Sequence, residues 1–249
     1  MNLMLEGKLA VVTGASRGIG RGVAIALAKE GADVALVARS RSELEEVAAA
    51  VGAQGRQAML LTCDVTNGPE LERAFSALER VDILINNAGM NIPEPFLKVT
   101  PEHYDAIFNL NVRAAFFAAQ LAAAKMMGQP SPGGVIVNLT SQMGHVGAVN
   151  RTVYCASKHA LEGLTKALAV ELAPHRIRVV SVAPTFTETP MTVPFFRDPS
   201  FRQSVLDSIP LGQTAAIEDI VNAVLFVASP AARMMTGASL LIDGGWTAK

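Results

Sequence analysis

The chain has 249 residues, of which 50% are hydrophobic and 17% are charged, and its formal net charge is -1. This length and apolar content suit one globular domain, residues 1–249, with a large core. A net charge near zero provides no basic field, which argues against a nucleic-acid partner.

Targeting signals are weak in this sequence. Gln120 and Lys125 interrupt the most apolar region, so we expect no membrane-spanning helix and no membrane partner. The N-terminus lacks a basic region followed by a long apolar run, so we expect no signal peptide. With Cys63 and Cys155 as the only cysteines, a reduced cytoplasmic protein is the simplest interpretation.

Predicted strands and helices alternate along the chain. Short apolar runs predict strands at residues 8–13, 33–38, 57–63, 82–85, 134–139, 177–182 and 239–242. Apolar periodicity and helix-start signals predict helices from about residue 23, from 41, and at 69–80, 101–127, 160–172 and 217–228. This alternation predicts an α/β fold: a Rossmann-type, doubly wound parallel sheet of about seven strands with helices on both faces.

A glycine-rich turn directly follows the first predicted strand. Gly14, Gly18 and Gly20 have the spacing Gly-x-x-x-Gly-x-Gly, and a predicted helix comes next. Glycines let a backbone turn tightly and approach a pyrophosphate, which rests on the helix N-terminus. The spacing differs from the commonest fingerprint, but a turn between a strand and a helix favours a dinucleotide over a purely structural role.

The end of the second predicted strand indicates which dinucleotide is bound. NAD-binding chains place an acidic residue there, about 20 positions after the turn, to bind the ribose 2′-hydroxyl. This chain has Ala38, Arg39, Ser40 and Arg41 instead. Arg39, together with Arg17 from the glycine turn, is suited to a 2′-phosphate, so we expect NADP(H). The alternative is that both arginines are solvated surface charges.

Tyr154 and Lys158 lie four residues apart near the start of a predicted helix, so they share one face, one turn apart. A tyrosine hydroxyl titrates near 10, and a neighbouring ammonium should lower its pKa. Such a phenol can exchange a proton with a carbonyl or alcohol oxygen as a general acid or base. Ser141, just beyond a predicted strand, would donate a hydrogen bond to the same oxygen.

Candidate residues also follow the carboxyl ends of other predicted strands. Ligands of parallel sheets bind outside these ends, so we expect one site to gather Gly14, Arg39, Asp64, Asn87, Ser141 and Pro184.

Together these motifs resemble the short-chain dehydrogenase/reductase family. The resemblance rests on Thr13-Gly14-x-x-x-Gly18-x-Gly20, Asn86-Asn87-Ala88-Gly89, Ser141 and Tyr154-x-x-x-Lys158, and it covers essentially the whole chain. It implies a catalytic tetrad of Asn111, Ser141, Tyr154 and Lys158, with Asn111 holding a water of a proton relay. It also implies cofactor contacts from Gly14, Ser16, Arg17, Gly18, Ile19, Gly20, Arg39, Ser40, Asp64, Val65, Asn87, Ala88, Gly89, Tyr154, Lys158, Pro184, Thr187 and Thr189. One departure is Thr185, where the family usually has glycine.

The resemblance implies an oxidoreductase that moves a hydride between the nicotinamide of NADP(H) and a small-molecule carbonyl or secondary alcohol, with Tyr154 as general acid/base. A 3-oxoacyl-type ketone reductase is the first expectation, and a sugar or polyol dehydrogenase is the alternative. A catalytically silent nucleotide-binding regulator and a structural subunit of a larger assembly are more remote. Relatives also imply a homotetramer.

Substrate contacts are expected from Ser141, Tyr154 and His145, which lies in the loop after Ser141. Residues 187–212, rich in proline and phenylalanine, predict an irregular substrate lid. The remaining histidines lack metal-ligand spacing, so we expect no metal.

Overall fold

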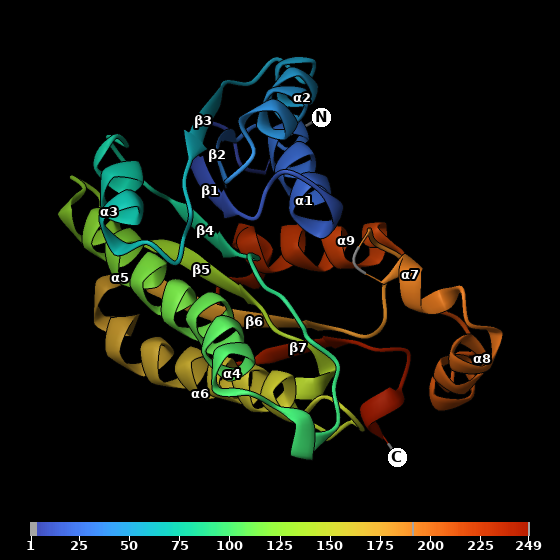
Figure 1. Cartoon of the computed structure of the whole chain (residues 1–249). Helices are drawn as coiled ribbons and strands as arrows, with labels where there is room; N and C mark the ends of the chain where they lie inside the picture. The colour runs from blue at the N-terminus through green and yellow to red at the C-terminus, as the bar shows by residue number, and fades with distance from the viewer. Residues whose placement is uncertain (1–3, 191, 249) are drawn as a thin grey trace.

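The computed structural model describes residues 4–190 and 192–248. Seven parallel strands form one sheet in the order β3-β2-β1-β4-β5-β6-β7 (Figure 1). They are β1 (Leu9–Thr13), β2 (Asp33–Ala38), β3 (Ala58–Thr62), β4 (Ile83–Asn86), β5 (Gly134–Leu139), β6 (Ile177–Pro184) and β7 (Ser239–Ile242). The predicted doubly wound Rossmann-type sheet is therefore confirmed, and its strand order reverses between β1 and β4.

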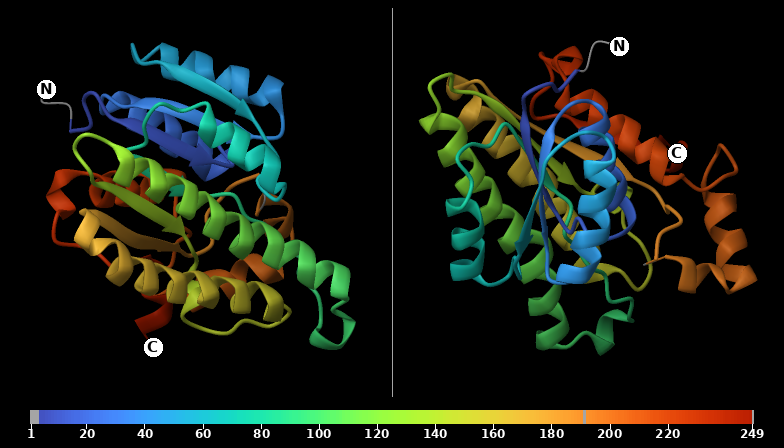
Figure 2. Two further views of the ribbon diagram at one scale, coloured as in Figure 1. Left: turned by 90° about the vertical axis from the view of Figure 1, so that its left-hand side faces the viewer. Right: turned by 90° about the horizontal axis from the view of Figure 1, so that it is seen from above.

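Helices cover both faces of the sheet (Figure 2). One face carries α1 (Gly18–Lys29), α2 (Arg41–Gly52) and α9 (Ile217–Ala228). The other carries α3 (Gly68–Ser76), α5 (Ala114–Gly128) and α6 (Thr152–Leu172), with α4 (Pro101–Phe108) leading into α5. Side chains of β1 alternate between the two cores: Ala10 and Val12 join the first, and Leu9 and Val11 join the second.

The helical stretch Pro101–Gly128 is long and apolar enough to cross a membrane, with a mean hydropathy of 1.2 in its most apolar window. The expectation of no membrane-spanning helix stays a prediction, since length and mean hydropathy alone do not distinguish a membrane span from a core helix. In the fold this stretch packs as a core helix: Ala114, Ala118 and Ala122 are buried against the sheet. The expected cytoplasmic location stays a prediction.

Several element boundaries differ from the predicted ones: α1 begins at Gly18 and α6 at Thr152, several residues before the predicted starts. Helix α3 ends at Ser76, because the next turn tightens and buries Leu78. The long helix 101–127 is interrupted by a π turn, η2 (Asn109–Arg113), which hydrophobic periodicity does not reveal. Strand β6 continues to Pro184, two residues beyond its predicted end.

The predicted irregular stretch after Pro184 contains two helices, α7 (Val193–Phe196) and α8 (Pro199–Ser208). Asp198 starts α8 by accepting a hydrogen bond from the Ser200 amide at 2.9 Å, and Pro199 occupies the first turn. Figure 1 and Figure 2 show both helices standing out from the sheet. Whether residues 187–212 move as a lid stays a prediction, and residue 191 lies outside the described residues.

Candidate active site

A cavity of about 800 Å³ lies at the carboxyl ends of β1 to β6. Its lining brings together most of the residues that the sequence singled out: Gly14, Ser16, Arg17, Gly18, Ile19, Arg39, Ser40, Asp64, Val65, Asn87, Ala88, Gly89, Ser141, Tyr154, Lys158, Pro184, Thr187 and Thr189. One cavity therefore spans the glycine turn and the tyrosine–lysine pair. Gly20, Asn111 and His145 fall outside its lining.

The glycine turn forms one end of the cavity. Gly14 and Gly18 have φ angles of +65° and +56°, in the left-handed region that favours glycine. The Asn87 side-chain amide donates to the carbonyl oxygens of Thr13 at 2.9 Å and Gly14 at 3.1 Å, which ties β4 to the turn. A methyl group on Gly20 would collide with the Gly14 carbonyl oxygen, so Gly20 permits close packing beneath the turn.

Positive charge gathers beside this turn. Arg17 and Arg39 are exposed, line the cavity, and form no ion pair of 4.0 Å or less with any described residue. Glu43, in the first turn of α2, also lines the cavity, so a carboxylate does approach this region. Sequence reasoning missed Glu43 because it looked only at the end of β2.

Asp64 also lines the cavity and lies two residues after the end of β3. Its carboxylate accepts hydrogen bonds from the Thr66 amide at 2.9 Å and the Thr66 hydroxyl at 2.7 Å. These bonds hold the pKa of Asp64 below its usual range. Asp64 is therefore a fixed anion with its orientation set by the protein.

Tyr154, Ser141 and Lys158 meet at the other end of the cavity. The Ser141 hydroxyl is hydrogen-bonded to the Tyr154 phenol and accepts a hydrogen bond from the Met143 amide at 3.1 Å. Lys158 donates to the Leu139 carbonyl oxygen at 2.8 Å, and its Nζ lies 5.6 Å from the centre of the Tyr154 ring. Ser141 follows β5 at the N-cap of the short turn η3 (Gln142–Gly144), and Tyr154 and Lys158 lie on α6, which packs against that turn.

The expected pKa of Tyr154 is wrong in direction. Burial raises the pKa of Tyr154 to about 12, although the hydrogen bond from Ser141 and the charge of Arg151 oppose this rise. Burial also lowers the pKa of Lys158 to about 8, against the attraction of Glu162. Tyr154 therefore keeps its proton at neutral pH, which is the state that a proton donor needs.

Asn111 lies behind the cavity wall, in the π turn, and is 1% exposed. Its Oδ1 accepts from the Met90 amide at 2.8 Å, and its Nδ2 donates to the Met90 carbonyl oxygen and to Ser157 Oγ, both at 3.0 Å. The side chain thus clamps the loop after β4 to α6. The expected water contact of Asn111 stays a prediction.

His145 is not among the residues that line the cavity, and its expected contact with substrate stays a prediction. Its Nε2 lies 3.0 Å from Ser239 Oγ and 3.2 Å from Glu162 Oε1. Glu162 is 6% exposed and also accepts hydrogen bonds from the hydroxyls of Thr140 at 2.6 Å and Ser181 at 2.7 Å. This buried carboxylate holds the imidazole beside Ser239, the first residue of β7.

Glu162 provides a test of the role of Lys158. A neutral Lys158 no longer supplies positive charge near the reacting oxygen, so carbonyl reduction should decline as pH rises through about 8. Glu162→Gln removes the charge that raises the pKa of Lys158, so the decline should move to lower pH. The measurement is kcat/KM for reduction from about pH 6 to pH 10. Glu171→Gln, at an exposed position of the same helix, is the control, and an unmoved profile in Glu162→Gln would contradict the electrostatic role.

Sequence reasoning missed several residues of the cavity, namely Met90, Asn91, Gln142, Met143, Arg151 and Phe186; it noted Thr185 only as a departure from the family pattern, and Thr192 and Phe195 only as part of the expected lid. Some of their polar atoms are buried without a hydrogen-bond partner among the described residues: both amide atoms of Gln142, Asn91 Oδ1 and Thr185 Oγ1. Gln142 directly follows Ser141, and Arg151 comes three residues before Tyr154. Proximity to the predicted catalytic residues was the signal that could have identified both.

Known proteins share this architecture. The family model described as "Enoyl-(Acyl carrier protein) reductase" matches residues 14–247. L-xylulose reductase of Bos taurus is 41% identical over all of both chains. A short-chain type dehydrogenase/reductase from Mycobacterium marinum has a TM-score of 0.94 at 37% identity, covering 100% of this chain and 98% of that one. A gluconate 5-dehydrogenase from Burkholderia cenocepacia J2315, in complex with NADP and tartrate, has a TM-score of 0.94 at 27% identity, with the same coverage.

Proposed function

Because the chain belongs to the short-chain dehydrogenase/reductase family, we propose that it is an NADPH-dependent reductase whose substrate is a polyhydroxylated ketone. Its relatives are oxidoreductases, and it is an enzyme acting on a CH–OH group or the corresponding carbonyl. The relatives named for sugars and sugar acids support the sugar or polyol alternative more than the 3-oxoacyl ketone that we expected first. The remote possibilities of a silent regulator and a structural subunit have no such support.

Gln142 is the observation that carries the choice of substrate. It is 1% exposed, lines the cavity beside Ser141, and neither of its amide atoms has a partner among the described residues. Leaving a buried polar group unpaired costs roughly 1–3 kcal/mol. A hydroxyl group both donates and accepts, so a substrate hydroxyl near the carbonyl can satisfy this amide once binding uncovers its two atoms, which are closed to solvent in this structure. The methylene groups of an acyl chain cannot.

The opposite end of the cavity fits a dinucleotide phosphate. Gly14, Ser16, Gly18 and Ile19 line the cavity where the turn leads into the N-terminus of α1, a position that suits a phosphate. Arg17 and Arg39 would contact the 2′-phosphate, and Glu43 would oppose them in part. Bound NADPH would supply the hydride to the carbonyl carbon.

The protein side of the reaction is proton transfer and charge stabilisation. Tyr154, protonated at neutral pH, would give its proton to the substrate oxygen as negative charge develops there. Ser141 would donate a hydrogen bond to that oxygen. Lys158, held by the Leu139 carbonyl, would add positive charge close to Tyr154.

Isotope transfer tests this proposal. When the enzyme reduces a ketose or keto sugar acid with NADPH deuterated at the hydride position, the product should carry deuterium on the new carbinol carbon. Mass spectrometry and NMR of the product measure this. NADPH consumption without a deuterated polyol product would contradict the proposed function.

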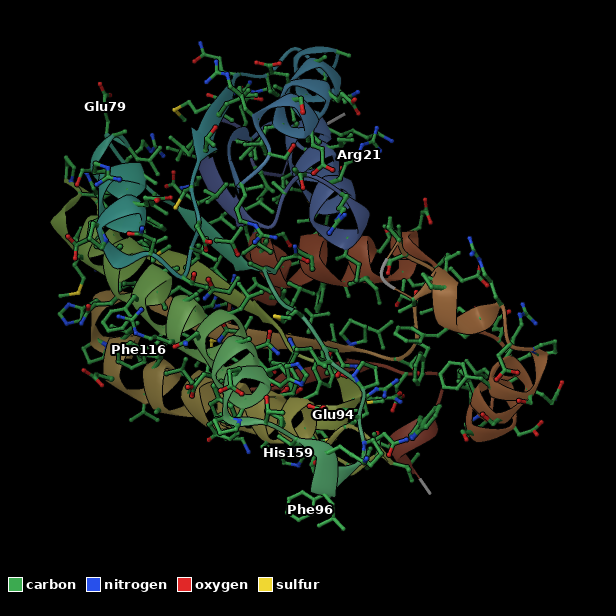
Figure 3. All side chains as sticks on the ribbon, viewed as in Figure 1. Arg21, Glu79, Glu94, Phe96, Phe116 and His159 are labelled. Carbon is green, nitrogen blue, oxygen red and sulfur yellow. The ribbon has the colours of Figure 1, made fainter. Side chains whose placement is uncertain are left out.

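We also propose a homotetramer, because α5 and α6 keep apolar side chains exposed on the sides that point away from the sheet. Phe116 on α5 is 42% exposed (Figure 3). Phe117 on the same helix is 37% exposed, and Val170 on α6 is 79% exposed. Apolar patches of this kind mark contact surfaces. Light scattering at micromolar concentration should give the mass of four chains, and Phe116→Asp should reduce it. A monomeric wild-type protein would refute the assembly.

A further inference from the structure

Arg151 is a buried arginine in the cavity that the mechanism above does not use. It lies at the N-cap of α6 and is 9% exposed. Its Nη1 donates to the Asn150 carbonyl oxygen at 3.2 Å, and its guanidinium lies 5.7 Å from the centre of the Phe195 ring. Among the described residues, no carboxylate lies within 4.0 Å of it.

A structural role does not explain a charge at this position. Burying an unpaired charge is costly, and a cation at a helix N-terminus opposes the helix dipole. The single bond to Asn150 uses one of the five N–H donors of the guanidinium. Arg178 shows the contrast: its guanidinium donates to the carbonyl oxygens of Val227, Ser229 and Met235, which satisfy it within the fold.

The surroundings of Arg151 suit an anion of the substrate. Arg151 lines the same cavity as Gln142 and acts electrostatically on Tyr154, so a group bound to it would lie near the reacting carbonyl. Its planar fork matches the two oxygens of a carboxylate. The Phe195 ring on α7 supports the guanidinium from one side.

We propose that Arg151 binds a substrate carboxylate, so that this enzyme reduces a keto sugar acid in preference to a neutral ketose. This inference rests on the proposed function and narrows its substrate class. It separates the chain from relatives named for a neutral ketose, such as L-xylulose reductase, and groups it with those named for gluconate.

Two ketones that differ only in the charged group provide the test. L-sorbose carries a hydroxymethyl group where 5-keto-D-gluconate carries a carboxylate. We expect kcat/KM with NADPH to be at least about tenfold higher for the keto acid in the wild type. Arg151→Gln should lower that value by about 10- to 100-fold for 5-keto-D-gluconate, and by less than about threefold for L-sorbose.

Two control variants separate charge from structure. Phe195→Leu removes the supporting ring but keeps the guanidinium, so it should affect the keto acid less than Arg151→Gln does. Arg202→Gln makes the same charge change on α8, where Arg202 pairs with Glu188 at 3.8 Å and does not line the cavity, and should leave both substrates unchanged. Thermal unfolding of each variant verifies that it is folded.

The outcomes are distinct. Equal losses on both ketones in Arg151→Gln would make Arg151 a structural residue and overturn the proposal. A wild-type preference for L-sorbose would also overturn it, while leaving the proposed reduction of polyhydroxylated ketones intact. Reduction of acetoacetyl esters but of neither sugar would reject the proposed function itself.

Discussion

Tyr154→Phe should lower kcat for ketone reduction by a factor on the order of 10² to 10⁴. The substitution removes only the hydroxyl, and with it the proton donor next to Ser141. Because burial raises the pKa of Tyr154 to about 12, the wild-type hydroxyl is protonated over the neutral range, and no other phenol replaces it. Steady-state rates of NADPH oxidation at saturating substrate measure the change.

Tyr104 provides the matched control, since the chain has only two tyrosines. Its ring stacks on Phe108 with 4.5 Å between ring centres, and it does not line the cavity. Tyr104→Phe should therefore leave kcat unchanged. Near-normal turnover of Tyr154→Phe, with an unfolding temperature like that of the wild type, would remove Tyr154 from the mechanism.

Arg39→Asp should reverse the choice of cofactor. We expect the wild type to favour NADPH over NADH by about tenfold in kcat/KM, because Arg17 and Arg39 offer charge-assisted contacts to a 2′-phosphate that solvent partly weakens. Aspartate at position 39 would repel that phosphate and accept hydrogen bonds from the ribose hydroxyls instead. Equal or better wild-type kcat/KM with NADH would contradict the expected preference.

Three further variants localise this effect. Arg17→Ala should weaken NADPH and leave NADH nearly unchanged, whereas Arg21→Ala, in the next turn of α1 and outside the lining of this cavity, should change neither (Figure 3). Glu43→Gln should strengthen the preference for NADPH, because it removes the carboxylate that approaches the arginines. In each comparison, kcat/KM for NADPH and for NADH is measured by varying the cofactor at one fixed substrate concentration.

Much of the fold is visible in the sequence because its central strands are buried on both faces and its edge strands β3 and β7 are also apolar. Continuous apolar runs therefore predict them directly, and the bounds of β5, β7 and α9 agree with prediction. The helix α8 was missed although Asp198 and Pro199 carry its start signal, since the neighbouring prolines favoured an irregular loop. The π turn at Asn111 depends on contacts with Met90 and is not encoded in any local pattern.

In the site, strand ends predict which residues meet, but not what each side chain contacts. The direction of the Tyr154 pKa depends on burial by distant segments, which spacing along one helix does not report. His145 turns toward Glu162 and Ser239, which are remote from it in sequence. Gln142 became apparent only from its burial and its missing partners, and Arg151 only from its burial and the absence of an ion pair with any described residue.

The central claim is that this cavity reduces polyhydroxylated ketones with NADPH. Its most direct test is a competition in which the wild-type enzyme is offered a keto sugar and an acetoacetyl thioester together, with both products quantified. The account predicts a higher kcat/KM for the keto sugar, because its hydroxyl groups satisfy the buried amide of Gln142. A higher kcat/KM for the acetoacetyl thioester would contradict it.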